Sequence, residues 1–128
     1  MIAGIGIDLA TISRVVKVHA RFGERFARRI LHEKELQSYS DHACQERFLA
    51  KRFAVKEAAV KALGTGERSG VLLKDFYVEH DDLGKPLLRV SGAAAERCSA
   101  QGIDGFWVSL TDEGDTVAAF VVLERSSQ

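Results

Sequence analysis

The sequence has few of the residues that bind metals through sulfur or imidazole. Its two cysteines, Cys44 and Cys98, lie far apart and form no metal-binding spacing. We expect two free thiols rather than a disulfide, because no leader for export opens the chain. Each of the four histidines stands alone, so the sequence predicts no histidine metal site.

The chain also lacks an excess of charge of either sign. Lys plus Arg and Asp plus Glu both number 18. This balance argues against a protein dominated by nucleic-acid or membrane electrostatics. No apolar run approaches the length of a membrane span. We therefore expect a cytoplasmic protein without membrane or nucleic-acid partners. A hydrophobic content of 46% is enough for the core of a single domain over residues 1–128.

One long stretch with helical periodicity is present, ERFLAKRFAVKEAAVKALGTG at residues 46–66. Large apolar residues and alanines recur along it, and no glycine or proline interrupts it before Gly64. Glycine directly after a helix adopts the left-handed conformation more easily than other residues. The pattern predicts a long central helix that ends at Gly64.

The charges of this helix admit two interpretations. After Arg47 it has one acid, Glu57, among the bases Lys51, Arg52, Lys56 and Lys61. In the first interpretation, Glu57 and Lys61 form an i,i+4 ion pair and the other bases are solvated. In the second, the bases and Glu57 bind a phosphorylated ligand with Mg²⁺, which takes oxygen ligands from carboxylates and from phosphate. The second interpretation needs another carboxylate from elsewhere in the chain.

Asp8 is the candidate for that second carboxylate. It lies near the end of a stretch, residues 2–10, that we predict to be a mostly buried strand. Alternation along the strand places Asp8 on the same face as two glycines. A carboxylate in an apolar strand is costly unless it is paired, hydrogen-bonded or bound to a metal. Alternatively, Asp8 begins the turn into the next helix, with Thr11 or Ser13 as the N-cap.

The next stretch, residues 13–30, predicts a helix that is broken near Gly23 and has a basic face. Arg14, Arg21 and Arg25 recur on that face with few acids to balance them. The face is either solvated surface or a docking site for an acidic partner. A nucleic-acid partner lacks support, because no aromatic or glycine-rich RNA signature is interleaved.

The other elements complete a mixed fold. We expect a short helix at 31–40, a hairpin of 71–79 with 87–91, a helix from 91 or 92 to 102, and a hairpin of 106–111 with 117–124. The predicted fold class is a compact α+β domain with an antiparallel sheet packed on the central helix.

Four segments in this order resemble one family. They are GIGIDLATISR, RFLAKRFAVKEAAVKALGTG, DDLGKPLLRVSG and WVSLTDEGDTVAAFVVLE. Together they cover nearly the whole chain. They are similar to the small, stand-alone phosphopantetheinyl transferases of the holo-[acyl-carrier-protein] synthase type. The first two segments are specific, whereas the last two alone would not identify the family.

The resemblance implies a reaction and a set of site residues. Members transfer the 4′-phosphopantetheine arm of coenzyme A to a serine of an apo acyl carrier protein and release adenosine 3′,5′-bisphosphate. They are trimers with sites at subunit interfaces. Asp8 and Glu57 match their Mg²⁺ ligands, and Glu57 is also our candidate for the general base. The matches for coenzyme A are Lys61 and Arg52 at its phosphates, with Gly64, Thr65, Gly66, Lys85 and Pro86 in loops that line the nucleotide site. Arg14, Arg21 and Arg25 match the surface that grips the carrier protein.

The sequence departs from the family at one position and leaves other functions open. Many relatives have a Ser-His pair where this chain has Thr111 and Asp112. That histidine helps to bind phosphate, and an ionised aspartate cannot donate the same hydrogen bond. One alternative function is a non-catalytic module that docks an acidic protein or nucleic acid through the basic helix. Another is a transferase serving polyketide or peptide synthases, although the short chain favours the stand-alone type.

Overall fold

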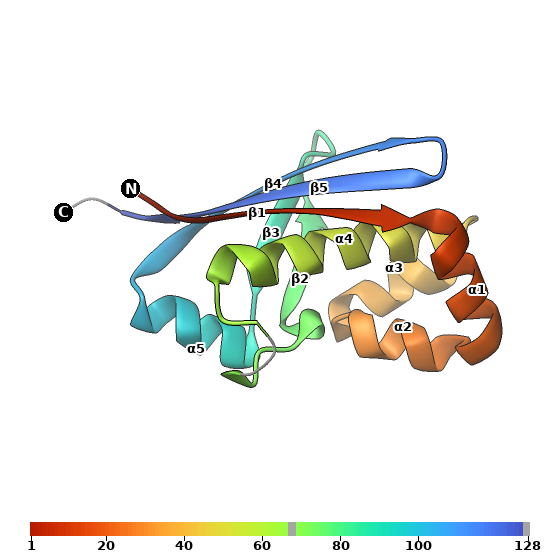
Figure 1. Ribbon diagram of the computed structural model, residues 1–128, viewed down its shortest axis with the longest axis horizontal. Coiled ribbons are helices and arrows are strands. Elements are labelled where there is room, and N and C mark those ends of the chain that lie inside the picture. Colours follow the sequence, from red (N-terminus) through yellow and green to blue (C-terminus); the bar gives the residue numbers. More distant parts are fainter. Residues whose placement is uncertain (67–68, 127–128) are drawn as a thin grey trace.

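The computed structural model describes residues 1–66 and 69–126, and Figure 1 shows a sheet lying over a layer of helices. The strands are β1 (Ile2–Thr11), β2 (Phe76–His80), β3 (Pro86–Val90), β4 (Ile103–Glu113) and β5 (Thr116–Arg125). The helices are α1 (Ile12–Phe22), α2 (Glu24–Ile30), α3 (Leu36–Asp41), α4 (Gln45–Leu63) and α5 (Gly92–Ala100), with 3₁₀ turns η1 (Glu33–Glu35) and η3 (Leu73–Asp75). The α+β class is confirmed.

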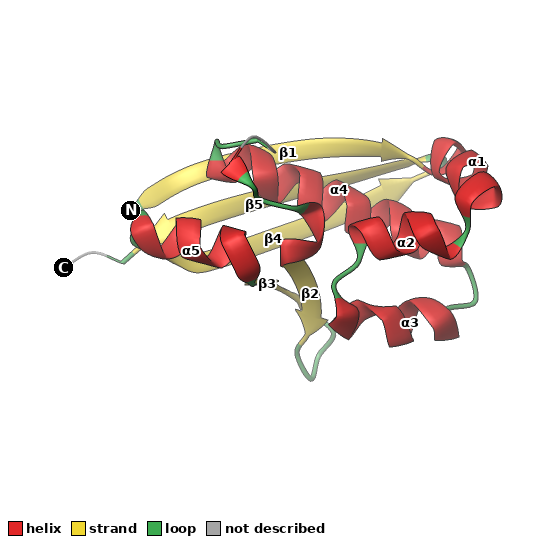
Figure 2. Ribbon diagram, turned by 90° about the horizontal axis from the view of Figure 1, so that it is seen from below, coloured by secondary structure: helices red, strands yellow, loops and turns green. Residues whose placement is uncertain are grey.

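The larger sheet has the antiparallel order β1-β5-β4, and its inner face packs on the central helix α4. Figure 2, seen from the helix side, shows α4 in front of this sheet, with α1 and α2 at one end and α5 at the other. The inner face of β5 supplies Val117, Ala119, Val121 and Leu123, all of them buried. The predicted packing of an antiparallel sheet on a long central helix is therefore confirmed.

Helix α4 begins and ends close to the predicted positions. It is followed by Gly64 in the left-handed conformation, with φ at 78°, as the sequence predicts. Strand β1 lies almost directly on this helix. A Cβ atom at Gly4 would come within 1.9 Å of the Ala62 carbonyl oxygen, and one at Gly6 within 2.0 Å of the Ala58 carbonyl oxygen. Only glycine permits this approach of strand to helix.

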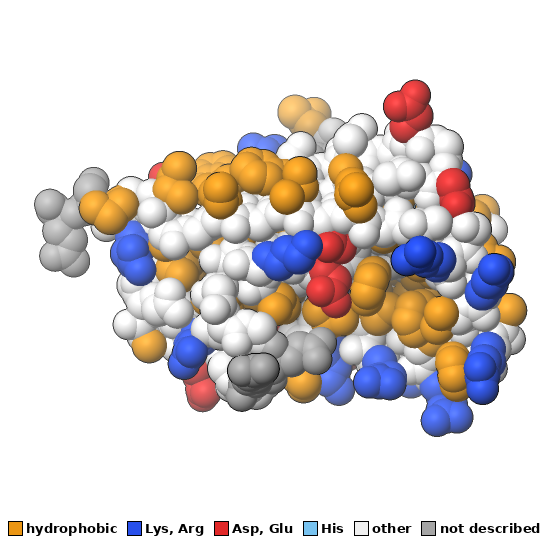
Figure 3. Space-filling model, in the orientation of Figure 1, with side chains coloured by type: hydrophobic (Ala, Val, Ile, Leu, Met, Phe, Trp, Pro, Cys, Tyr) orange, Lys and Arg blue, Asp and Glu red, His pale blue; other side chains and the backbone are white. Residues whose placement is uncertain are grey.

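Strand β1 is not the mostly buried strand that we expected. Its outward side chains Ile5, Ile7 and Leu9 are 60%, 62% and 66% exposed, respectively. The prediction was wrong because alternating apolar residues show that a face exists, not that something in the same chain covers it. Figure 3 shows the resulting row of hydrophobic side chains along the upper edge of the molecule, where β1 runs.

Two other segments differ from the prediction. Residues 71–75 were expected in a strand, but Leu73–Asp75 forms a 3₁₀ turn, and the two-stranded sheet consists of β2 and β3 alone. The short helix of 31–40 is a 3₁₀ turn followed by α3, and Glu35 accepts a hydrogen bond from the His32 amide at its start. The predicted break near Gly23 is confirmed, since α1 and α2 meet there with φ at 57°.

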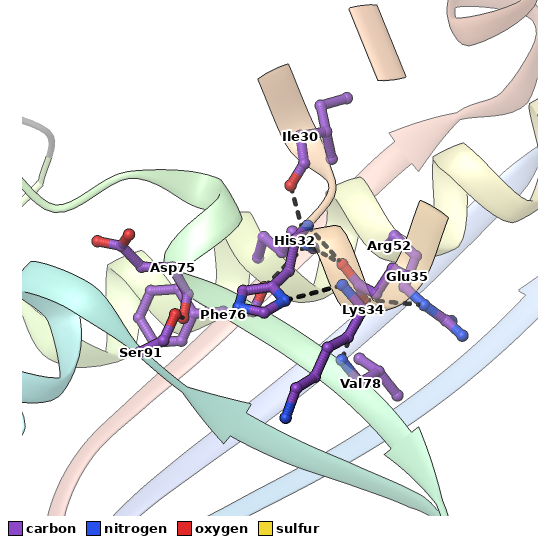
Figure 4. A network of polar contacts seen from close by, with 10 residues as sticks. Ile30, His32, Lys34, Glu35, Arg52, Asp75, Phe76, Val78 and Ser91 are labelled. Carbon is purple, nitrogen blue, oxygen red and sulfur yellow. Dashed lines mark hydrogen bonds and ion pairs between the residues drawn. The ribbon is translucent and has the colours of Figure 1, made fainter. Parts of the chain in front are cut away.

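A buried cluster of charges joins α4 to η1 and β2 (Figure 4). The Lys56 ammonium is fully buried, lies 2.5 Å from Glu35 Oε1, and donates hydrogen bonds to the carbonyl oxygens of Ile30 and Phe76, each at 2.8 Å. The second oxygen of Glu35 accepts from the Val78 amide at 3.0 Å. The interpretation in which Lys56 is solvated is wrong, because Lys56 is buried among partners that come from distant segments.

The described residues also bear on thiols, membrane-spanning helices and clusters of metal-binding side chains. Cys44 and Cys98 are free thiols, as predicted. Residues 1–66 and 69–126 contain no helix that is both long and apolar enough to cross a membrane. The same residues contain no group of three or more His, Cys, Asp or Glu side chains arranged to hold a metal ion.

Candidate active site

Asp8 and Lys61 form a direct contact between β1 and α4. The Lys61 ammonium donates hydrogen bonds to Asp8 Oδ1 at 2.9 Å and to the Ile7 carbonyl oxygen at 3.1 Å. Asp8 faces α4 because it shares the inner face of β1 with Gly4 and Gly6. The predicted glycine face is confirmed. The alternative, in which Asp8 begins the turn into α1, is wrong because the strand continues to Thr11, although Thr11 is the N-cap of α1, one of the two residues expected there.

Glu57 belongs to the same site. The pKa of Lys61 is raised first by the hydrogen bond that it donates to Asp8, then by the charge of Asp8, and also by the charge of Glu57. Both carboxylates therefore act on one ammonium group. Glu57 also lines a cavity of about 740 Å³ between α4 and helices α1 and α2, together with Arg25, Phe22 and Phe26. The carboxylate is thus open to the surface that contains the basic helices.

The donor atoms of this site fit Mg²⁺ rather than a softer metal. Asp8 and Glu57 offer carboxylate oxygens, and their charges already attract a cation, the Lys61 ammonium. Mg²⁺ binds through one or two carboxylates and takes its remaining ligands from water and substrate phosphates. A two-carboxylate site is therefore compatible with a metal that phosphates help to hold.

A second, larger cavity of about 930 Å³ lies on another side of α4 and contains other predicted residues. Arg52, Lys85 and Pro86 line it, together with residues of β4. The ammonium of Lys85 lies 5.5 Å from the centre of the Trp107 ring. Since successive helical residues are rotated by about 100°, Arg52 and Glu57 point to different sides of α4. Within one chain, the cavity and the carboxylate pair are separate.

Arg52 is held at the floor of this larger cavity. Its guanidinium lies over the Phe48 ring at 4.5 Å, and its Nε atom is 3.3 Å from Glu35 Oε2. That contact is an ion pair without hydrogen-bond geometry, so Nε keeps no hydrogen-bond partner among the described residues. Burial lowers the pKa of Arg52, and the charge of Glu35 raises it. An arginine buried in this way favours an anionic ligand.

The glycine loop of residues 64–66 follows the end of α4, one turn beyond Lys61. Gly64 and Gly66 both have positive φ, at 78° and 60°. The Thr65 hydroxyl is buried, with no hydrogen-bond partner among the described residues. The structure therefore places this loop at the Lys61 end of the helix, away from the larger cavity.

The three predicted docking residues lie on the helices at the end of the sheet. Arg14 and Arg21 of α1 and Arg25 of α2 are all exposed. Figure 3 shows basic side chains gathered over this end of the molecule. Arg25 also lines the smaller cavity with Glu57, so the basic surface reaches the carboxylate site.

Comparisons with known proteins agree with this architecture. The model of the 4′-phosphopantetheinyl transferase superfamily matches residues 4–121. The chain belongs to this superfamily. A holo-[acyl-carrier-protein] synthase of Vibrio cholerae is 54% identical over 125 residues, which are 98% of this chain and 99% of that protein.

Solved structures of other superfamily members have the same fold. The holo-[acyl-carrier-protein] synthase of Neisseria meningitidis is 42% identical, with a TM-score of 0.91 over 98% of this chain and 100% of its own. The enzyme of Bacillus anthracis, solved in complex with CoA (3′,5′-ADP), is 35% identical, with a TM-score of 0.81 over 98% and 99% of the two chains. The predictions of the family and of an enzyme are confirmed.

Sequence reasoning missed one contact at the site of this phosphopantetheinyl transferase. Arg47 and Asp112 form an ion pair at the wall of the larger cavity, with 2.5 Å between Nη1 and Oδ2. Asp112, with Thr111, occupies the position where we expect a Ser-His pair in many relatives. Its partner is 65 positions away and gives no local signal. The strand period of β4 alone could have placed Asp112 on the face toward α4.

Proposed function

We propose that this protein transfers the 4′-phosphopantetheine arm of coenzyme A to a serine of an apo acyl carrier protein in a Mg²⁺-dependent reaction. The supporting observation is that the charges of Asp8 in β1 and Glu57 in α4 both raise the pKa of the Lys61 ammonium. Two carboxylates and one cation in a phosphopantetheinyl transferase are the groups that phosphate chemistry needs. Residues 1–128 then act as one transferase domain, in the cytoplasm.

The reaction joins the serine oxygen to the phosphorus that bears the pantetheine arm. The bond from this phosphorus to the bridging oxygen breaks, and the electron pair leaves with adenosine 3′,5′-bisphosphate. Glu57 accepts the serine proton as the general base. Lys61 complements the charge of the pyrophosphate oxygens. Mg²⁺, held by Asp8 and Glu57, would supply further positive charge to the same oxygens.

The nucleotide end of coenzyme A has two candidate contact regions. The glycine loop of residues 64–66 offers backbone close to Lys61, and the larger cavity offers Arg52, Lys85 and Pro86. The Bacillus anthracis relative, solved with CoA (3′,5′-ADP), supports coenzyme A as co-substrate. Because the two regions lie on different sides of α4, two copies of the chain would bring both regions together at one ligand. This separation supports sites at subunit interfaces.

A homotrimer would bury the exposed face of the larger sheet. The outward residues Ile5, Ile7 and Leu9 pair in register with Val122, Phe120 and Ala118 of β5, and Trp107 of β4 continues the same face. Trp107 and Phe120 are 51% and 42% exposed, respectively. A contiguous apolar face of this kind marks an interaction surface. We propose that other copies of the chain cover it, as in the trimers that the family resemblance implies.

The carrier protein is proposed to dock on α1 and α2. Arg14, Arg21 and Arg25 supply positive charge for an acidic partner. The cavity of about 740 Å³ connects this surface to Glu57, so that a serine of the docked partner can reach the base. Arg25 and Arg29 of α2 line this cavity together with Glu57, which supports docking on this face.

Intact-mass spectrometry tests the proposed function. An apo acyl carrier protein is incubated with this protein, coenzyme A and Mg²⁺, with EDTA in a matched sample. We expect a mass gain of one phosphopantetheine that EDTA prevents. Coenzyme A binding without any gain in mass would contradict the choice of carrier protein. If coenzyme A does not bind and the carrier protein gains no mass, the result would contradict the reaction and favour the docking module.

A further inference from the structure

The ion pair of Arg47 and Asp112 lies on the wall of the larger cavity and has no role in the proposed reaction. Arg47 lies in the first turn of α4, and Asp112 lies near the end of β4. Their side chains are 41% and 31% exposed, so solvent reaches both. An exposed ion pair contributes little to folding stability. The position of this pair at the wall of a cationic cavity points instead to a role in ligand binding.

The strand register explains why Asp112 reaches α4. Asp112 pairs with Val117 of β5, which in turn pairs with Ala10 of β1. Val117 and Ala10 are both buried on the inner face of the sheet. The Asp112 carboxylate therefore faces the helix, where it meets Arg47 Nη1. A guanidinium has five N–H donors in a planar fork, so a contact through Nη1 leaves other donors for a ligand.

The cavity around this pair favours an anion. Besides Arg47, its cationic lining residues are Lys34, Lys51, Arg52 and Lys85. Its acids are already engaged: Glu35 with Lys56, Glu79 with Arg89 and Asp112 with Arg47. Coenzyme A has a phosphate on its ribose, away from the pyrophosphate bond that breaks. This phosphate is the anion that a cavity separate from Asp8 and Glu57 would take.

We propose that Arg47 binds the ribose phosphate of coenzyme A and that Asp112 is the positioning residue that aims Arg47 into the cavity. This inference rests on the proposed function, because it takes coenzyme A as the ligand. A long arginine side chain loses rotamer freedom when it binds, and a fixed partner reduces that loss. Asp112 alone would repel a phosphate. Its effect on affinity is favourable only while Arg47 is present.

A double-mutant cycle with two ligands tests this role. The dissociation constants of coenzyme A and 3′-dephospho-coenzyme A are measured by calorimetry for the wild type, Arg47→Ala, Asp112→Ala and the double variant. For coenzyme A, we expect Arg47→Ala to weaken binding about tenfold, the loss of one charge-assisted hydrogen bond. Asp112→Ala should weaken it about threefold in the wild-type background. In the Arg47→Ala background, the same change should strengthen it.

The dephosphorylated ligand and a control variant separate this role from a structural one. 3′-Dephospho-coenzyme A should bind equally well to all four proteins. In the transfer assay, the variants should change KM for coenzyme A but not kcat. Asp104→Ala, which removes a carboxylate at the other end of β4, should leave both affinities unchanged.

The other outcomes distinguish a failure of the positioning role from a failure of the proposed reaction. Equal losses for both ligands, or the same sign of the Asp112→Ala effect in both backgrounds, would overturn the positioning role. If the wild type binds coenzyme A with the expected pattern but transfers nothing, the inference stands and the proposed reaction fails. If the wild type binds no coenzyme A, both fail.

Discussion

Lys61 of α4 donates a hydrogen bond to Asp8 of β1, with 2.9 Å between Nζ and Oδ1. The contact joins two elements that are 53 residues apart in sequence. It also gives Lys61 two possible roles, since the same ammonium can neutralise Asp8 or complement a phosphate. In the proposed reaction, a metal at Asp8 replaces the first role and leaves Lys61 for the second.

Two substitutions at this contact should have opposite effects on metal binding. Asp8→Ala removes a ligand, and we expect it to abolish the Mg²⁺-dependent rate. Lys61→Met removes a competing cation, so Mg²⁺ should bind more tightly while coenzyme A binds more weakly. Metal titrations of the rate and calorimetry of both variants provide the measurement. An unchanged Mg²⁺ dependence in Asp8→Ala, or weaker metal binding in Lys61→Met, would count against this assignment.

Glu57→Gln tests the general base. The amide keeps the size of the side chain but cannot accept the serine proton, so kcat should fall by about a hundredfold or more. Single-turnover transfer and Mg²⁺ binding are measured on the same preparation. A retained rate with normal metal binding would refute the role of Glu57 as base. A lost rate with lost metal binding would assign Glu57 to the metal alone.

The charge reversal of Arg14 and Arg21 to Glu tests carrier-protein docking. Both side chains are exposed and distant from the larger cavity, so the double variant should raise KM for the carrier protein by about tenfold or more. KM for coenzyme A should not change. The salt dependence of the carrier-protein KM should also weaken. Equal effects on the two substrates would remove docking as the explanation.

Gly6→Ala tests the direct contact of β1 with α4. The added methyl group would lie 2.0 Å from the Ala58 carbonyl oxygen and 2.8 Å from the Ala62 amide nitrogen. Because helix backbone cannot move aside cheaply, we expect a loss of about 3 kcal/mol in the free energy of unfolding. Gly105→Ala is the control, since its nearest neighbours are side-chain atoms of Glu124 and Trp107 at 3.0 Å or more. Equal losses in denaturant unfolding would contradict the argument.

Lys56→Met tests the buried charge cluster. It leaves Glu35 buried without its ammonium partner, and we expect a loss of about 3 kcal/mol. Lys51→Met, at a partly exposed position of the same helix, should change stability by about 0.5 kcal/mol or less.

The pH dependence of stability gives the same cluster a second test. Burial lowers the pKa of Lys56 from 10.5 to about 8, against the opposing effect of Glu35. Between these values the unfolded chain binds more protons at this residue than the folded chain does. The free energy of unfolding should therefore rise with pH across this window, relative to Lys56→Met. A parallel pH profile in both proteins would show that Lys56 does not titrate as expected.

The elements that depend on local signals were predictable, and those that depend on distant partners were not. Helix α4 is fixed by its own periodicity and by Gly64, and the inward direction of Asp8 follows from strand alternation. The burial of Lys56 was not predictable, because a lysine among helical bases resembles a solvated one until Glu35 is placed beside it. The pairing of Arg47 with Asp112 depends on how β4 lies over α4, which no local pattern contains.

The exposure of the outer face of β1 could not be predicted from the sequence for a different reason. Its sequence alternates correctly for a two-sided strand, and apart from Asp8 and Thr11 its residues are apolar or glycine. One face meets α4 of the same chain, whereas Ile5, Ile7 and Leu9 on the other face are 60%, 62% and 66% exposed, respectively. A single sequence specifies that a surface is apolar without stating which molecule covers it.

The glycines of β1 also bear on how the site responds to its ligands. Because Gly4 and Gly6 let the strand backbone touch the backbone of α4, the distance between the element that bears Asp8 and the one that bears Glu57 is set by main-chain contact. No side-chain rotamer lies between them to be adjusted. The relative position of the two backbone segments is therefore set when the chain folds, and ligand binding need not supply that entropy again. Any adaptation to a cation of a different size then falls to the Asp8 and Glu57 side chains rather than to a movement of β1 relative to α4.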